Sequence, residues 1–309
     1  MIPLLLLHKI LQLFAVMVIG FLLVKLKLIK TEDSLTLSRI SLYLLLPAAI
    51  INSFQVDLTG EILVGFLFSI AAGIVLHGVL LLIDLAFVKF MKGGAVERAS
   101  VFYSNAANLI IPIVAFVLGD EWVIYSLGFM MIQLIFIWSH GVSLFEDGSR
   151  INLRKILLNP TILAIAAGLI MLLSRVRLPE FVTDITSSFG SVLGYFGMLI
   201  AGITAAKLDI KGTVKNPRLY ITSLLRVVIV PVITLVLIKI ALIFITLEGA
   251  DKILLISFLA TATPSAATVM QFAQLYDVDG EYSVAINILT TLISCATIPI
   301  FVLLYQAII

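Results

Sequence analysis

The stretch SNAANLIIPIVAF, Ser104–Phe116, places two asparagines and a proline inside a long apolar run. A helix that only crosses lipid avoids such residues. Free amides find no water there, and proline removes a backbone donor and clashes with the preceding turn. We therefore expect the helix to open at Pro112, near the middle of a membrane. Such openings persist only where they are buried in protein or line a wet cavity.

A second interruption, ATATPSAAT, occupies residues 260–268, and Pro264 is expected to open that helix in the same way. Each opening leaves a half-helix whose N-terminus carries positive partial charge, and two such ends that meet form a site for a carboxylate. The alternative is a pair of proline kinks whose amides bond helix to helix. One break alone favours the kink, whereas two matched breaks favour a binding site. The residues expected to bind substrate are Asn105, Asn108, Pro112, Thr263, Pro264, Ser265, Gln271 and Asn287.

The composition is that of a membrane protein. Of 309 residues, 61% are hydrophobic and only 12% are charged, and the mean hydropathy is +1.21. A soluble domain of this length needs far more polar surface. The net charge of +2 gives no reason to expect nucleic acid as a partner. The single cysteine, Cys295, excludes an internal disulfide and a thiolate metal cluster.

Ten segments are long and apolar enough to cross a hydrocarbon core about 30 Å thick. The first is interpreted as a membrane span rather than a cleaved signal peptide, because it lacks a basic leading region and a small-residue cleavage site. No connection is long enough to hold a soluble domain. The expected spans are 3–24, 35–55, 62–89, 98–118, 122–145, 158–174, 181–205, 218–246, 252–275 and 281–308.

The orientation follows from the basic residues of the short connections. Fourteen lysines and arginines fall on the odd-numbered connections and four on the opposite side. The odd connections are therefore expected to face the cytoplasm of a cell (plasma or inner) membrane, with both termini outside. Five spans followed by five more predict two inverted repeats, residues 1–155 and 156–309, because a duplicated unit with an odd number of spans inserts its second copy upside down. The interrupted span is the fourth in each half.

Three of the ionisable residues inside expected spans stand out as functional candidates, because charged groups at membrane depth are costly. His77 and Asp84 lie seven residues apart near one helix face and could pass protons, although Asp84 is also close enough to Lys89 to reach the membrane interface. Arg226 is expected to pair with Asp84 or Glu146, to snorkel, or to meet an anion. The other polar residues of the spans, Gln133, His140, Gln271 and Asn287, are each typical of helix-to-helix bonding, and Gln271 and Asn287 also follow the second break.

Small residues and missing motifs complete the pattern. Gly190, Gly194 and Gly197 share one face of the seventh span and predict close helix approach, either within the chain or across a dimer. The sequence contains no GxxxxGK[ST] loop, no HExxH and no GxSxG, so ATP binding by a P-loop and the familiar hydrolase sites are excluded. We expect no catalytic residue, no metal site and no enzyme activity.

Four stretches resemble the auxin efflux carrier family, which includes bacterial malonate and malate permeases and the plant PIN-FORMED carriers. RISLYLLLP keeps an arginine, Arg39, eight residues before Pro47. NAANLIIP keeps the spacing from Asn105 to Pro112. The other two stretches are RVVIVP from Arg226, and ATPSAATVMQFAQLYDVD followed by TIPIFVLLYQ. At one position, where plant members carry proline, this chain has Val269, and it lacks the long cytoplasmic loop of many plant carriers.

The resemblance implies an all-α fold of ten transmembrane helices, akin to the bile-acid sodium symporters, with helices four and nine broken and crossed. Spans one, two, six and seven (about 1–55 and 158–207) would form a scaffold that often dimerises. The remaining spans (about 60–150 and 215–309) would form a transport domain that moves like an elevator and holds substrate at the crossing.

The function expected from these observations is secondary active transport of small organic anions, carboxylates that could be auxin-like or dicarboxylates. The alternatives are a passive anion channel, in which the breaks form a filter, and a membrane sensor or partner that does not transport. No cofactor is expected other than a coupling ion, and a proton is favoured over sodium because neither break contains a carboxylate. The expected partners are the anion, lipid and a second copy of the chain.

Overall fold

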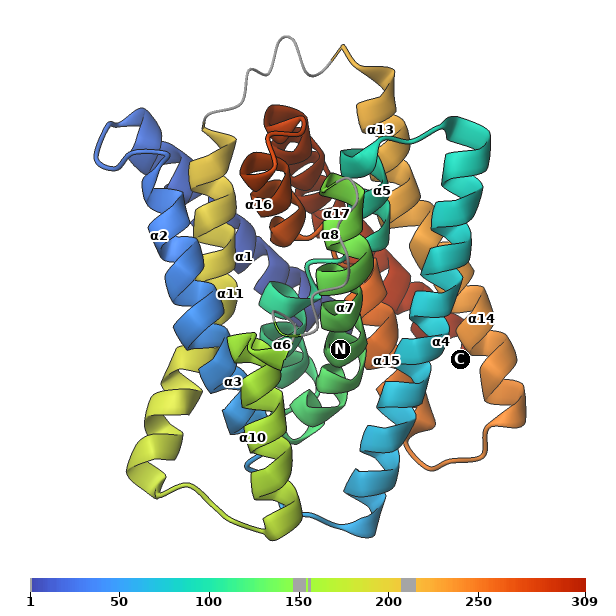
Figure 1. Ribbon diagram of the computed structural model, residues 1–309. Coiled ribbons are helices and arrows are strands. Elements are labelled where there is room, and N and C mark those ends of the chain that lie inside the picture. Colours follow the sequence, from blue (N-terminus) through green and yellow to red (C-terminus); the bar gives the residue numbers. More distant parts are fainter. Residues whose placement is uncertain (1, 147–153, 155–156, 207–214) are drawn as a thin grey trace.

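The fold is a bundle of long helices around two broken ones (Figure 1). A computed structural model describes residues 2–146, 154, 157–206 and 215–309. Within these ranges the chain is helical and contains no β-strand, only an isolated bridge between Ser104 and Ser265. The predicted boundary between residues 155 and 156 lies outside the described residues.

Helices occupy every expected span. The first half contains α1 (Ile2–Lys25), α2 (Asp33–Ile40), α3 (Leu46–Ser53), α4 (Gly60–Met91), α5 (Ala95–Phe102), α6 (Ala106–Val117), α7 (Ser126–Phe136) and α8 (Val142–Phe145). The second contains α10 (Pro160–Ser174), α11 (Glu180–Ala205), α13 (Pro217–Leu224), α14 (Val230–Phe244), α15 (Ala250–Ala262), α16 (Ala267–Leu275) and α17 (Gly280–Ile308). Tighter or wider turns join several of them: a 3₁₀ turn at Asp120–Tyr125 and π turns at Ser41–Leu45, Ile137–Gly141 and Leu225–Ile229.

Six continuous helical segments of the described chain are long and apolar enough to cross a membrane by themselves. Further apolar helices are shorter, among them α10 and the part of α6 from Asn108 to Val117. The protein is therefore an all-α, multi-pass membrane protein. The six long segments are Asp33–Ser53, Gly60–Met91, Asp120–Phe145, Glu180–Ala205, Pro217–Phe244 and Gly280–Ile308.

Local sequence explains where several helices begin. Asn159 and Asn216 each accept a hydrogen bond from a backbone N–H of the helix that follows, and each is followed by proline at the first helical position. Proline is suited to that position because its missing N–H has no helical partner there. Thr59 caps α4 in the same way through Ile62 N. These caps define the N-terminal ends of α4, α10 and α13.

The first helix break lies elsewhere than predicted. Pro112 stays inside α6, and the chain leaves the helix earlier, between Phe102 and Ala106. Proline removes only one bond of a helix that is otherwise intact, whereas the residues around Ser104 exchange their helical bonds for bonds to the second break. The expectation for the second break was correct, because Pro264 lies between α15 and α16.

Helices α2, α3, α10 and α11 stand on one side of the molecule, α4, α13 and α14 stand on the other, and the broken helices lie between them (Figure 1). In the first group α11 packs on α3 and α3 packs on α10, and α11 also packs closely on α1. Glycine permits the closest of these approaches. A Cβ on Gly20 would collide with the Leu199 carbonyl of α11, and a Cβ on Gly202 would collide with the Met17 carbonyl of α1.

Gly202→Ala should therefore destabilise the protein by about 1–3 kcal/mol, because the added methyl meets backbone that only a helix shift can move. Thermal unfolding in detergent measures the effect. The matched control is Gly78→Ala on α4, where a Cβ would meet nothing within 4 Å. Equal melting temperatures for the two variants would contradict the close packing of α1 on α11.

Candidate functional site

The two breaks cross each other and pair as a short antiparallel bridge. The backbone N–H of Asn105 donates to the carbonyl of Pro264 at 2.8 Å, and the N–H of Ala266 donates to the carbonyl of Tyr103 at 3.0 Å. Backbone groups without partners are costly at membrane depth. Each break therefore supplies hydrogen-bond partners for the backbone groups of the other. Without the second break, these groups of the first would lack partners.

Side chains from neighbouring helices complete the crossing. Gln133 of α7 accepts from both the N–H and the hydroxyl of Ser104, at 3.1 and 2.6 Å, and its amide donates to the Ser104 carbonyl at 2.9 Å. At the second break, Asn287 of α17 donates to the Ser265 carbonyl at 2.6 Å, and the Thr290 hydroxyl accepts from the Ser265 N–H at 3.2 Å. A polar residue from each supporting helix thus fixes the backbone of one break.

Arg226 holds the C-terminal ends of both broken helices. Its guanidinium is completely buried and donates to the carbonyls of Thr261 and Thr263 at 2.7–3.2 Å and to that of Val101 at 3.1 Å. These carbonyls belong to the last turns of α15 and α5, where the helix dipole is negative and carbonyls lack helical partners. The predicted carboxylate partners were wrong, because the buried cation is stabilised by helix ends instead.

The opposite ends of the crossing face a cavity of about 590 Å³. Both half-helix N-termini reach it, through Asn105 and Asn108 of the first and Ala267, Thr268 and Gln271 of the second. The cavity lies between these broken helices and the helices α2, α10 and α11. Most of its other walls are apolar: Leu35, Leu42, Leu46, Met130, Leu134, Ile137, Trp138, Ile200, Phe272 and Leu275.

Polar side chains of the cavity come from the first break, from α16 and from α2. Asn105 and Asn108 are more than nine-tenths buried, and the Asn108 amide donates to Asn105 Oδ1 at 3.0 Å. The Asn108 Oδ1 atom is buried without a hydrogen-bond partner. Arg39, an exposed residue of α2, contributes a full positive charge from the opposite wall. Positive charge thus reaches the cavity from a guanidinium and from two helix N-termini.

Comparison with known families agrees with this geometry. A family model described as membrane transport protein matches residues 5–150 and 148–302. The chain belongs to this family, that of the auxin efflux carriers. No curated protein matches the chain. The protein is therefore a membrane transporter by family, and the cavity at the crossing is its candidate substrate site.

The predicted site residues of the transporter divide into two groups. Asn105, Asn108 and Gln271 line the cavity. The others do not line it but build the crossing or pack behind it, as the backbone of Pro264 and Ser265 and the side chain of Asn287 do. The remaining two are Thr263, whose carbonyl binds Arg226, and Pro112, which packs against α11.

Several functional residues were missed or underrated at the sequence level. Arg39 was named for the resemblance to the family and was not predicted as a site residue, yet it lines the cavity, and its place among apolar residues was the available signal. Gln133 was interpreted as helix-to-helix bonding; it bonds helices, but it does so by holding the break itself. Tyr43 and Trp138 carried no signal in the sequence, because an aromatic residue is unremarkable in an apolar span.

The predicted pairing of His77 with Asp84 was wrong. His77 is completely buried, its Nδ1 lies 2.8 Å from the Gly73 carbonyl, and its ring packs among Phe102, Phe129 and Phe136. Asp84 turns instead toward Arg98. Helical spacing placed the two residues on similar faces, but Asp84 pairs with Arg98 of α5, whereas His77 contacts a carbonyl of its own helix.

The glycine face of α11 contacts α6 within the same chain. A Cβ on Gly194 would lie 2.8 Å from Pro112 Cγ, and one on Gly197 would lie 3.0 Å from Asn108 Cβ. Gly190 faces Ala49 of α3. The structure thereby assigns the partner of these glycines, which the sequence left open between an intrachain contact and a dimer.

Arg226→Met should destabilise the transporter strongly, by about 1–3 kcal/mol for each carbonyl left without a partner. Arg226→Lys should be intermediate, because an ammonium keeps the charge but lacks the planar fork that spans both helix ends. Thermal unfolding in detergent and transport in proteoliposomes measure these effects. The control is Lys239→Met, the exposed cation of the same span. An Arg226→Met protein as stable as the control would refute this role.

Proposed function

We propose that the protein is a secondary active transporter of organic anions and that the cavity at the crossing binds the anionic group. The observation that carries the proposal is the convergence of two half-helix N-termini and Arg39 on one cavity. Helix N-termini stabilise a carboxylate through their free N–H groups and positive partial charge. Arg39 adds a fork of donors that matches a carboxylate.

The walls of the cavity favour a particular kind of anion. Charged or amide groups come from Arg39, the broken helices, Gln133 and Asn159, whereas most of the remaining surface is apolar. A second carboxylate on the substrate would have to lie against leucine, methionine or aromatic side chains and lose its water without compensation. We therefore favour a monocarboxylate with an apolar body over a small dicarboxylate.

The packing supports alternating access of the elevator type. Helices α1, α3, α10 and α11 pack on one another, whereas α4 packs on α7 and α15, and α17 packs on α13, α15 and α16. The cavity lies where the two groups meet, and it is lined by α2, α10 and α11 on one side and by α6, α7 and α16 on the other. The glycines of α11 form part of this contact. These small residues let the two groups approach closely without a long side chain between them.

Asn105→Ala should weaken anion binding by about 10- to 100-fold, as expected for one lost bond to a charged group. The fold should persist, because the crossing uses the backbone N–H of Asn105, which alanine retains. Uptake of a labelled aromatic monocarboxylate into proteoliposomes measures the loss. Asn52→Ala is the control, since Asn52 lies in α3 and bonds Thr186, away from the cavity. Transport at the wild-type rate by Asn105→Ala would show that the anion binds elsewhere.

Arg39→Gln should raise the substrate concentration for half-maximal uptake at least tenfold, because it removes the full positive charge from the wall of the cavity. Arg175→Gln, at the exposed C-terminal end of α10, is the matched control and should transport normally.

Recordings in planar bilayers separate a carrier from a channel, because alternating access produces no unitary currents. If such currents appear and no counterflow is detected, the protein is a channel.

A further inference from the structure

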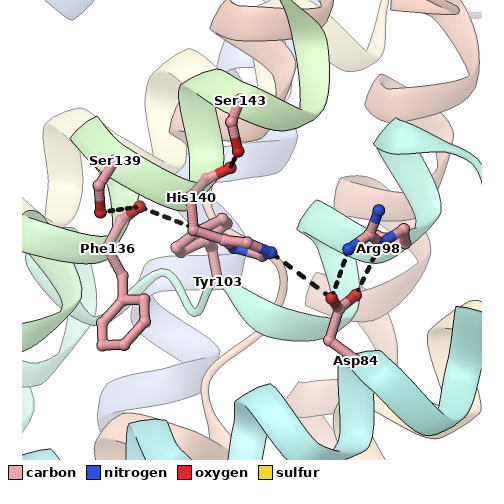
Figure 2. Close-up of polar contacts among 7 residues, drawn as sticks. All are labelled: Asp84, Arg98, Tyr103, Phe136, Ser139, His140 and Ser143. Atoms are coloured by element: carbon pink, nitrogen blue, oxygen red, sulfur yellow. Dashed lines mark hydrogen bonds and ion pairs between the residues drawn. The ribbon is translucent and has the colours of Figure 1, made fainter. Parts of the chain in front are cut away.

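A chain of buried and partly buried polar residues runs from α4 to the crossing, outside the lining of the cavity (Figure 2). Asp84 of α4 is 1% exposed and receives two hydrogen bonds from Arg98 of α5, Nε to Oδ1 at 3.0 Å and Nη2 to Oδ2 at 2.7 Å. The Nε2 atom of His140 lies 3.5 Å from Asp84 Oδ2. Its other ring nitrogen, Nδ1, lies 2.8 Å from the Tyr103 hydroxyl, which also lies 2.9 Å from the carbonyl of Phe136.

The hydrogen atoms of this chain can be counted. The Tyr103 hydroxyl has one hydrogen and two acceptor neighbours, Phe136 O and a neutral Nδ1. If it donates to Phe136, the ring must carry its hydrogen on Nδ1, and Nε2 presents a lone pair to the Asp84 carboxylate. If it donates to Nδ1, Nε2 carries the hydrogen and the Phe136 carbonyl loses the Tyr103 bond. Neutral His140 therefore always leaves one contact unmade.

A single added proton satisfies every contact. Imidazolium donates from Nε2 toward Asp84 and from Nδ1 to Tyr103, and the tyrosine hydroxyl then donates to Phe136. The Nε2 atom is buried and has no hydrogen-bond partner by strict geometry, so it is the open position in the chain. Asp84 and Arg98 carry opposite charges, so the cluster is neutral overall when His140 is uncharged. When His140 is protonated, the cluster carries one positive charge.

We propose that His140 binds the coupling proton of this transporter, and that the proton and the organic anion cross the membrane in the same direction. The inference rests on the proposed function, since it concerns the driving force of that transport. The link between the sites is Tyr103, whose hydroxyl contacts His140 and whose carbonyl accepts the N–H of Ala266, at the start of α16, where the second break ends. A positive charge placed there favours an anion at the adjoining cavity, and the anion favours the proton by the same factor.

The surroundings of His140, which is partly exposed, identify it rather than the completely buried His77 as the proton site. The charged and titratable groups that face it are Asp84 from α4, Arg98 from α5 and Tyr103 from the first break. His77 lies beyond the ring of Phe102, which contacts both histidines. In the described part of the chain His77 forms no ion pair with a carboxylate, and its Nδ1 faces the Gly73 carbonyl.

The local backbone connects His140 to the rest of the polar chain. His140 lies in a π turn, Ile137–Gly141, which directly follows α7 in the same membrane span. Such turns free a carbonyl from the helical pattern and recur at functional sites. Here the carbonyl of Phe136, at the start of the turn, is the one that accepts from Tyr103. The proton on His140 is therefore coupled to the backbone of both α7 and the crossing.

The test uses the full-length protein in proteoliposomes with a labelled aromatic monocarboxylate. Counterflow under equal pH on both sides measures anion exchange, and an imposed inward proton gradient measures coupling. Wild-type uptake should be accelerated severalfold by the gradient. His140→Gln should retain counterflow and lose the acceleration, whereas His8→Gln, an exposed histidine of α1, should behave as wild type. An unchanged response in His140→Gln overturns the proposal, as does a wild-type protein that exchanges the anion but ignores the gradient.

A second variant keeps the histidine and removes one of its bonds. Tyr103→Phe preserves the ring and deletes the hydroxyl acceptor, so the pH at which the gradient response is half-maximal should fall by about one unit. A midpoint that does not move contradicts the assignment even if His140→Gln fails to fold. Absence of counterflow in the wild type with any organic anion would instead refute the proposed function, so the two failures are distinguishable.

Discussion

One buried cation holds the centre of this protein together. Arg226 donates to carbonyls at the C-terminal ends of α5 and α15 and meets no carboxylate there. Interrupting two helices inside a membrane exposes carbonyls at two ends and N–H groups at the other two. A guanidinium has enough donors, in a fixed plane, to bind both sets of carbonyls at once. Three of these carbonyls, from two helix ends, are therefore satisfied by a single side chain.

The same arrangement gives the crossing a direction. Its negative ends are neutralised by Arg226, and its positive ends stay uncompensated where they reach the cavity. The direct bonds between the breaks, from Asn105 to Pro264 and from Ala266 to Tyr103, keep those ends at fixed positions. The polarity that suits an anion thus follows from how the breaks are stabilised. Because there are two breaks rather than one, two helix N-termini reach the cavity from different helices.

Much of this was predictable from the sequence, and the errors have a common origin. The two interruptions and the presence of Asn105, Asn108 and Gln271 beside them followed from residue type and spacing, and these three residues line the cavity. Pro112 was misjudged because a helix can tolerate one missing donor when its neighbours are paired. Arg226 and Asp84 were assigned wrong partners, since charge alone suggests a carboxylate for one and a nearby histidine for the other. Arg226 instead binds carbonyls of distant segments, and Asp84 pairs with Arg98 of the next helix. His140 looked like any single polar residue of a span until Asp84 and Tyr103 were seen beside it.

The sequence by itself determined that the chain is a helical membrane protein with two interrupted spans, because apolar length, proline and buried amides act within one segment. Only the tertiary structure decided where the first helix breaks, which carbonyls Arg226 binds and which residues share the cavity. Those outcomes depend on how groups from different helices satisfy one another's hydrogen bonds in a medium without water. Such pairings join residues more than a hundred positions apart, as Arg226 and Val101 do, and no local pattern encodes them.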